Sequence, residues 1–170
     1  VQARLGVVIS ELGGFLDQVV PLFRLFGAST LGSGRQYLSW IHLKDVVRIL
    51  ASAVTDGRFQ GPINVVAPTP ITNQAMTVEL RDVLKTFAAP AVPAVALKLL
   101  YGELSSALLG SQRVQPQFLQ SLGFAFSYPN FSQALQAVFP NLEPGEMQLT
   151  FEHWVPGELE RVWEFYSDEK

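Results

Sequence analysis

Several side chains in one short stretch of the sequence could act on a ligand. The stretch, GSGRQYLSWIHLKDVVRIL, spans residues 32–50. Arg35 could hold an anionic group through two parallel hydrogen bonds, or it could pair with a surface carboxylate. Trp40 could stack on a ligand, although packing in the core where a strand meets a helix is the role we favour for it. Arg35 and Trp40 are therefore the first candidates for a substrate-binding side.

His42 and Asp45, in the same stretch, have simpler explanations. A histidine titrates near neutral pH, so His42 could act as an acid or a base. A histidine just before a helix commonly caps it or bonds to backbone, and we favour that role. Asp45 stands in the first helical turn, where the helix dipole favours a carboxylate. We therefore name no catalytic residue from the sequence.

A second candidate site follows the first predicted strand, in the sequence SELGG. Ligands in open α/β sheets bind beyond the carboxyl ends of the strands, where this loop is expected. Paired glycines would let the backbone approach a ring closely. An ordinary turn between a strand and a helix explains the loop equally well. The residues predicted to bind a cofactor are Ser10, Glu11, Gly13 and Gly14.

Gln112 and Arg113, in GSQRV, complete the predicted substrate side. A solvated helix start accounts for them equally well. A metal site is not expected, because the chain has no cysteine and its two histidines, His42 and His153, lie in different modules.

The apolar pattern predicts strands and helices that would position these residues. The run LGVVI is typical of a strand buried on both faces of a parallel sheet. A natural chain seldom begins within such a strand, so we expect the upstream half of the domain to be missing. Helical spacing predicts one helix after the SELGG loop and another after His42, and Thr72 suits the N-cap of a third. The predicted core faces of the first two helices are Phe15, Val19, Leu22, Phe23 and Phe26, and Val46, Val47, Leu50 and Val54.

Composition limits the class of protein. The 170 residues carry a net charge of -3, with 48% hydrophobic and 16% charged residues, so a core is expected but no basic surface for nucleic acid or anionic membrane. No apolar run reaches the roughly 18 residues of a membrane span. We expect a cytoplasmic protein with a small-molecule substrate, and the protein could form a homodimer.

Several motifs occur here in the order found in a known family. They are RLGVVIS, GSGRQYLSWIHLKDVVRIL, GPINVVAPTPITN and GSQRVQPQFLQSLGFAFSYP, within residues 3–139. In these motifs the chain resembles the C-terminal half of an epimerase-like family of the extended or atypical short-chain dehydrogenase/reductases, some members of which are labelled cell-division-inhibitor-like. The resemblance implies an α/β fold: the C-terminal part of a Rossmann-like doubly wound domain with a small substrate-side subdomain. It also implies an NAD(P) cofactor in the intact protein, which we expect to be NADP.

The parts of that family that would hold the cofactor are not in this sequence. No glycine-rich phosphate loop occurs, so we expect this chain alone to bind no nicotinamide cofactor. The superfamily's Tyr-x-x-x-Lys pair belongs upstream; YSDEK, at Tyr166 and Lys170, matches its spacing but stands at the wrong place in the chain order. Nucleotide-sugar epimerases also carry an arginine a few residues before the Ile-His pair, where this sequence has Leu38, Ser39 and Trp40. A sugar-nucleotide phosphate clamp is therefore in doubt.

The end of the chain resembles a different family. PNLEPGE, residues 140–146, predicts a linker. Residues 147–170 resemble the first strand and helix of the START-like polyketide cyclase/dehydrase superfamily, an α+β fold around an apolar cavity. We therefore divide the chain into an epimerase-like part (1–139), a linker (140–146) and the truncated start of a START-like domain (147–170).

Two functions remain open at this point. The chain could be the substrate-side half of an NAD(P)-dependent epimerase or oxidoreductase, with its substrate unknown and the chain alone inactive. Alternatively, the Rossmann scaffold could be a non-catalytic binding or regulatory module, related to cell division and fused to a START-like domain that carries an apolar ligand.

Overall fold

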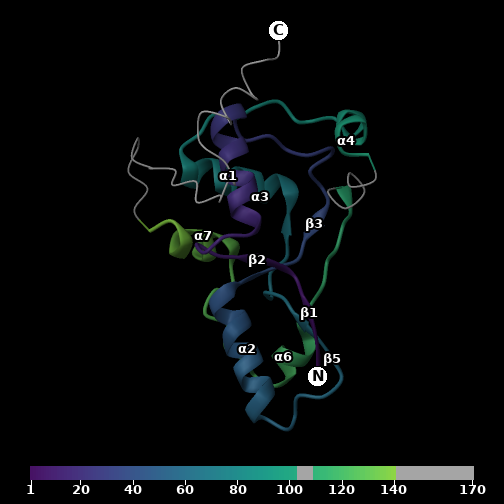
Figure 1. Cartoon of the computed structure of the whole chain (residues 1–170), viewed down its shortest axis with the longest axis vertical. Helices are drawn as coiled ribbons and strands as arrows, with labels where there is room; N and C mark the ends of the chain where they lie inside the picture. The colour runs from purple at the N-terminus through teal and green to yellow at the C-terminus, as the bar shows by residue number, and fades with distance from the viewer. Residues whose placement is uncertain (103–108, 141–170) are drawn as a thin grey trace, which may run out of the picture.

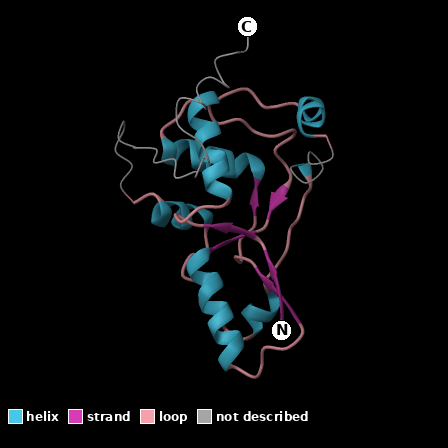
Figure 2. Cartoon of the chain, viewed as in Figure 1, coloured by secondary structure: helices cyan, strands magenta, loops and turns pink. Residues whose placement is uncertain are grey.

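Short strands alternate with helices along the chain (Figure 2). The structure is a computed structural model, and it describes residues 1–102 and 109–140 (Figure 1). The strands are β1 (Gln2–Leu5), β2 (Val7–Ile9), β3 (Tyr37–Leu38), β4 (Trp40–His42), β5 (Pro62–Val65) and β6 (Ile71–Thr72). The helices are α1 (Phe15–Phe26), α2 (Leu43–Thr55), α3 (Asn73–Leu84), α4 (Ala94–Tyr101), α6 (Gln117–Ser121) and α7 (Phe131–Val138). This order confirms the predicted α/β class.

The apolar run near the N-terminus forms two consecutive strands with different partners. β1 pairs in parallel with β5, and β2 pairs in parallel with β4. Gly6 joins the two strands, and a Cβ atom there would lie 2.7 Å from the carbonyl oxygen of Ser39. Any other residue would push β2 away from Ser39, the residue just before β4. The sequence therefore requires glycine at the point where the chain changes partners.

The prediction that this run is buried on both faces is only partly correct. Ile9 at its end is fully buried, whereas Leu5 is 52% exposed. Within the described residues β1 pairs only with β5, so one of its edges has no strand beside it.

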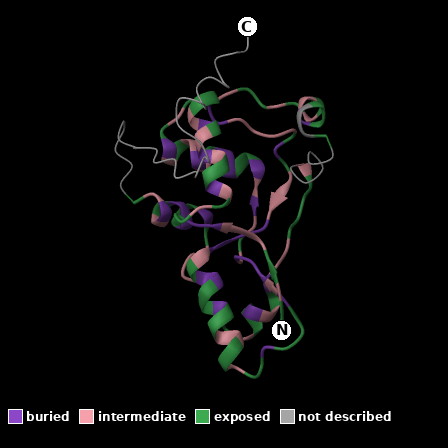
Figure 3. Cartoon of the chain, in the orientation of Figure 1, coloured by how far each residue is buried: buried purple, intermediate pink, exposed green. Residues whose placement is uncertain are grey.

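Two hydrophobic cores lie on either side of the β2–β4 pair (Figures 1 and 3). The first packs α1, α3 and α7 around Ile9, Trp40 and Leu80. The second packs α2 and α6 against β5 around Ile41, Ile49 and Ile63. Trp40 and Ile41 are neighbours in β4 and enter different cores. β4 therefore contributes to both cores, and this packing fixes the position of the carboxyl end of β4.

The predicted core faces of α1 and α2 are only partly correct. Leu22 and Phe26 of α1 are exposed, and so are Val47, Leu50 and Val54 of α2. Phe23 and Val46 are buried as predicted, and Phe15 and Val19 pack against the first core. The buried residues that the spacing did not predict are Leu16 and Val20 in α1, and Asp45 and Ile49 in α2. Both helices carry apolar residues on more than one face, so spacing alone could not select the face that meets the core.

The predicted N-cap at Thr72 is confirmed. Thr72 caps α3, since its hydroxyl oxygen accepts from the backbone N–H of Ala75 at 3.2 Å. None of the described helices is long and apolar enough to span a membrane. The predicted START-like segment, most of the linker before it, and the Tyr166–Lys170 pair lie outside the described residues.

Candidate functional site

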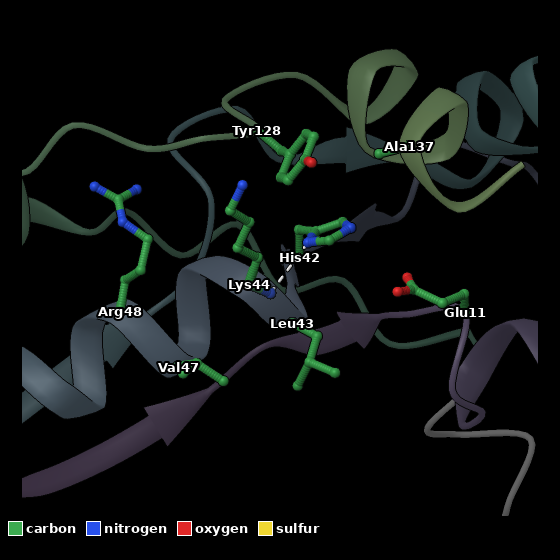
Figure 4. Close-up of a pocket in the computed structure, with 8 residues that line it drawn as sticks. All are labelled: Glu11, His42, Leu43, Lys44, Val47, Arg48, Tyr128 and Ala137. Atoms are coloured by element: carbon green, nitrogen blue, oxygen red, sulfur yellow. Dashed lines mark hydrogen bonds between the residues drawn. The ribbon is translucent and has the colours of Figure 1, made fainter. Parts of the chain in front are cut away.

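A pocket of about 440 Å³ opens where the parallel strands β2 and β4 end (Figure 4). Its polar side chains come from the loop after β2, from the end of β4, from α2 and from the segment before α7. The residues that line it are Glu11, His42, Leu43, Lys44, Val47, Arg48, Tyr128 and Ala137. Carboxyl ends of parallel strands are where open α/β sheets bind ligands. The pocket is therefore the candidate site.

His42 caps α2 and forms one wall of the pocket. Its Nδ1 accepts from the backbone N–H of Lys44 at 3.1 Å, which confirms the predicted capping role. In the neutral ring the proton must then sit on Nε2, because Nδ1 is the acceptor. Nε2 is buried and has no partner among the described residues.

The charge state of His42 is set by competing neighbours. Burial is the main influence and lowers the pKa of its imidazole below the ordinary 6.5. The carboxylates of Glu11 and Asp45 act in the opposite direction, and the ammonium group of Lys44 acts with burial. The ring is therefore held neutral at physiological pH, in the form that donates only through Nε2.

Asp45 does more than complement the helix dipole, which corrects the simple role predicted for it. Its carboxylate is fully buried and accepts from the backbone N–H groups of Ser127, at 2.8 Å, and Tyr128, at 3.0 Å. The guanidinium of Arg48 donates to the same carboxylate at 3.0 Å and to the carbonyl oxygen of Ala125 at 2.8 Å. Asp45 and Arg48 together form a clamp that holds the segment before α7 against α2.

This clamp places Tyr128, a site residue that the sequence did not reveal. The ring of Tyr128 lies 4.0 Å from that of His42, and the ammonium of Lys44 lies 5.9 Å from the same ring. Asp45 and Tyr128 are 83 positions apart in the chain, so no local pattern could have joined them. The spacing of Asp45 and Arg48 on one helix was the available signal for the clamp itself.

The SELGG loop contributes Glu11 to the pocket and otherwise forms the turn into α1. The hydroxyl oxygen of Ser10 accepts from the backbone N–H of Leu12 at 2.9 Å and closes the turn. Gly13 and Gly14 have φ of 119° and 96°, a region that favours glycine. Gly14 has open space around it, since a Cβ atom there would meet nothing within 4 Å. The turn explains both glycines, and of the four predicted cofactor residues it is Glu11 that lines the pocket.

The predicted substrate-side residues gather elsewhere. The backbone of Gln112 donates to the carbonyl of Tyr37 at 3.0 Å, and the guanidinium of Arg113 lies 5.0 Å from the Tyr37 ring. Arg35, Gln112 and Arg113 are exposed, and none of them lines the pocket that contains Glu11. The structure thus brings Gln112 and Arg113 to β3, beside the stretch that holds Arg35, and separates them from the pocket.

Trp40 is a core residue. Its side chain is fully buried, its indole N–H donates to the carbonyl of Thr69 at 2.8 Å, and its ring meets Phe131 edge to face at 5.1 Å. This placement agrees with the packing role and leaves the ring no free face for a ligand. Among the residues that the structure describes, no cluster of side chains could hold a metal ion.

Comparison with known proteins adds family evidence to this geometry. Residues 92–138 match a family described as "Domain of unknown function (DUF1731)". The chain is 39% identical over 135 residues to the "Epimerase family protein SDR39U1 homolog, chloroplastic" of Arabidopsis thaliana, which covers 79% of this chain and 39% of that protein. The crystal structure of "human epimerase family protein SDR39U1 (isoform2) with NADPH" aligns with a TM-score of 0.76 and 30% identity, over 82% of this chain and 48% of that one.

These matches show that the chain is similar to proteins named as epimerase family members, and they support the resemblance to the extended short-chain dehydrogenase/reductases. A crystal structure described as the nucleoside-diphosphate sugar epimerase from Corynebacterium glutamicum agrees, with a TM-score of 0.62 and 31% identity over 81% of this chain and 26% of that one. The shared fold confirms that the described residues form part of a Rossmann-type domain. The chain spans less than half the length of each of these three proteins.

Proposed function

We propose that residues 1–139 are the substrate-side half of an NAD(P)-dependent epimerase or oxidoreductase. The observation that carries the proposal is the pocket at the carboxyl ends of β2 and β4, with Glu11 and His42 on its walls. That position in a Rossmann-type sheet is where a ligand binds. The family matches favour this function over a non-catalytic regulatory module.

The cofactor we propose is NADP, bound jointly with polypeptide beyond this chain. A relative of 30% identity is described with NADPH. The loop that holds Ser10, Glu11, Gly13 and Gly14 would face the nicotinamide end, and the open space at Gly14 would admit a ring. The phosphates would need a glycine-rich loop at a helix N-terminus, which this sequence does not contain.

Two unsatisfied surfaces support docking of the other half of such a domain. β1 has an edge with no strand beside it among the described residues. On α2, Val47, Leu50 and Val54 are 58%, 41% and 87% exposed and follow one another along the helix. A further parallel strand would complete the edge, and a helix would cover the apolar stripe.

The substrate would extend from the pocket toward β3 under this proposal. Arg35, Gln112 and Arg113 lie exposed there and offer cationic and amide donors. Residues 147–170 are proposed, on the sequence resemblance alone, to begin a START-like domain after a linker at 140–146.

Calorimetric titration with NADPH tests the proposed division of labour. The chain of residues 1–170 should show no measurable binding, because it lacks the phosphate loop. A longer polypeptide that includes the residues encoded upstream should bind NADPH. Micromolar binding by the chain alone would contradict the division, and no binding of NADPH or NADH by the longer polypeptide would contradict the function.

A further inference from the structure

His42 presents a hydrogen-bond donor for which the described residues offer no acceptor. The bond from the Lys44 backbone to Nδ1 fixes the ring and leaves the proton on Nε2. His42 as a residue is only 6% exposed, and its Nε2 is buried without a partner among the described residues. Figure 4 shows this nitrogen turned toward the side of the pocket where Glu11 lies. Buried donors are nearly always satisfied, so this one indicates an acceptor that is not part of the described chain.

The other side chains around the pocket limit what the acceptor can belong to. The ionised carboxylate of Glu11 can accept hydrogen bonds but cannot donate one. The charge of Arg48 is directed to the buried carboxylate of Asp45. The positive charge of Lys44 then balances the negative charge of Glu11, so the pocket as a whole carries no net charge to attract an ion. Leu43 and Val47 add apolar wall between the polar groups.

We propose that this pocket binds a neutral α-hydroxy carbonyl compound. Nε2–H of His42 donates to the carbonyl oxygen, and the neighbouring hydroxyl group donates to the carboxylate of Glu11. The inference rests on the proposed function and deepens it, because nicotinamide cofactors interconvert hydroxyl and carbonyl groups. In this proposal His42 and Glu11 select a substrate that carries a hydroxyl group next to a carbonyl group.

The fold holds the His42 donor in place. The hydrogen bond from the Lys44 backbone N–H to Nδ1 fixes the His42 ring, and the centroid of the Tyr128 ring lies 4.0 Å from that of His42. Tyr128 is held in turn by the clamp of Asp45 and Arg48. A site that hydrogen-bonds a hydroxyl group can discriminate between ligands that differ by that group, because the ligand without it leaves a polar group of the site unpaired.

A pair of small probes with the same carbon skeleton tests the proposal on residues 1–170 without nucleotide. Acetoin (3-hydroxy-2-butanone) carries both groups, and 2-butanone lacks the hydroxyl group. Nuclear magnetic resonance of the His42 imidazole nitrogens reports binding at the donor itself. We expect acetoin to bind roughly fivefold or more tightly than 2-butanone, the value of one hydrogen bond.

Matched variants assign the two contacts. His42→Asn keeps an N-cap acceptor for Lys44 and removes the Nε2–H donor, so binding of both probes, followed at the Lys44 amide, should weaken. Glu11→Ala should remove the preference for acetoin and leave 2-butanone unchanged. Asp82→Ala, on the exposed surface of α3, should change neither.

Equal affinity for the two probes, or His42 nitrogens that respond to neither, would overturn the proposal. A preference that survives Glu11→Ala would overturn it too. Because these measurements need no nicotinamide cofactor, their failure is distinct from a failure of the longer polypeptide to bind NADPH.

Discussion

Replacing Asp45 with alanine should be among the most destabilising single changes in the described part of the chain. The carboxylate is fully buried and accepts three hydrogen bonds, at 2.8, 3.0 and 3.0 Å, from Ser127, Tyr128 and Arg48. Alanine leaves two backbone N–H groups and a guanidinium without this acceptor. A hydrogen bond to a charged group contributes about 1.5–3 kcal/mol, and the three share one acceptor, so their losses do not add fully. We expect the free energy of unfolding to fall by about 3–5 kcal/mol, mostly from the two backbone N–H groups, because Arg48 is partly exposed and can be hydrated.

Urea unfolding of residues 1–170, followed by tryptophan fluorescence and circular dichroism, measures this loss. The control is Asp82→Ala, which breaks an exposed Arg–Asp pair and should change stability by less than about 1 kcal/mol. Asp45→Asn should lie between the two, since it keeps one acceptor oxygen and turns an NH₂ group toward one of the donors. If Asp45→Ala costs no more than Asp82→Ala, the clamp does not hold the segment before α7 and the reasoning about Tyr128 fails.

Three further outcomes are expected. Burial lowers the pKa of folded His42 below 6.5, so between the two pKa values the unfolded chain binds more protons than the folded one. The stability contributed by His42 should therefore be complete above pH 6.5 and decline as the pH falls toward the folded pKa. A series of unfolding measurements at different pH values should lose this dependence in His42→Asn. Trp40→Ala should lower the free energy of unfolding by about 3–5 kcal/mol in denaturant titrations, since the ring is fully buried, and a loss below about 1 kcal/mol would contradict its role in the core. Arg35→Ala in the longer polypeptide should weaken substrate binding by about 1.5–3 kcal/mol with little change in Tm; unchanged affinity and turnover would remove Arg35 from the site.

The sequence by itself determined the features that depend on neighbouring residues. The alternation of strands and helices, the cap at Thr72 and the cap at His42 all follow from residues a few positions apart. The SELGG turn was also readable, because two adjacent glycines permit the positive φ that the turn requires. The ordered motifs carried the resemblance to the epimerase family, which the comparisons support.

Only the tertiary structure decided which faces are buried and which side chains meet. α1 and α2 carry apolar residues on more than one side, so the packing partner rather than the spacing chose Ile49 over Leu50. Tyr128 reaches His42 because Asp45 binds a backbone segment 83 positions away. Arg35 and Glu11, both predicted to face a ligand, come to different parts of the molecule for the same reason. Local sequence sets the conformation of each short element, but contacts between distant elements depend on how all of them pack at once, and that information is spread over the whole chain.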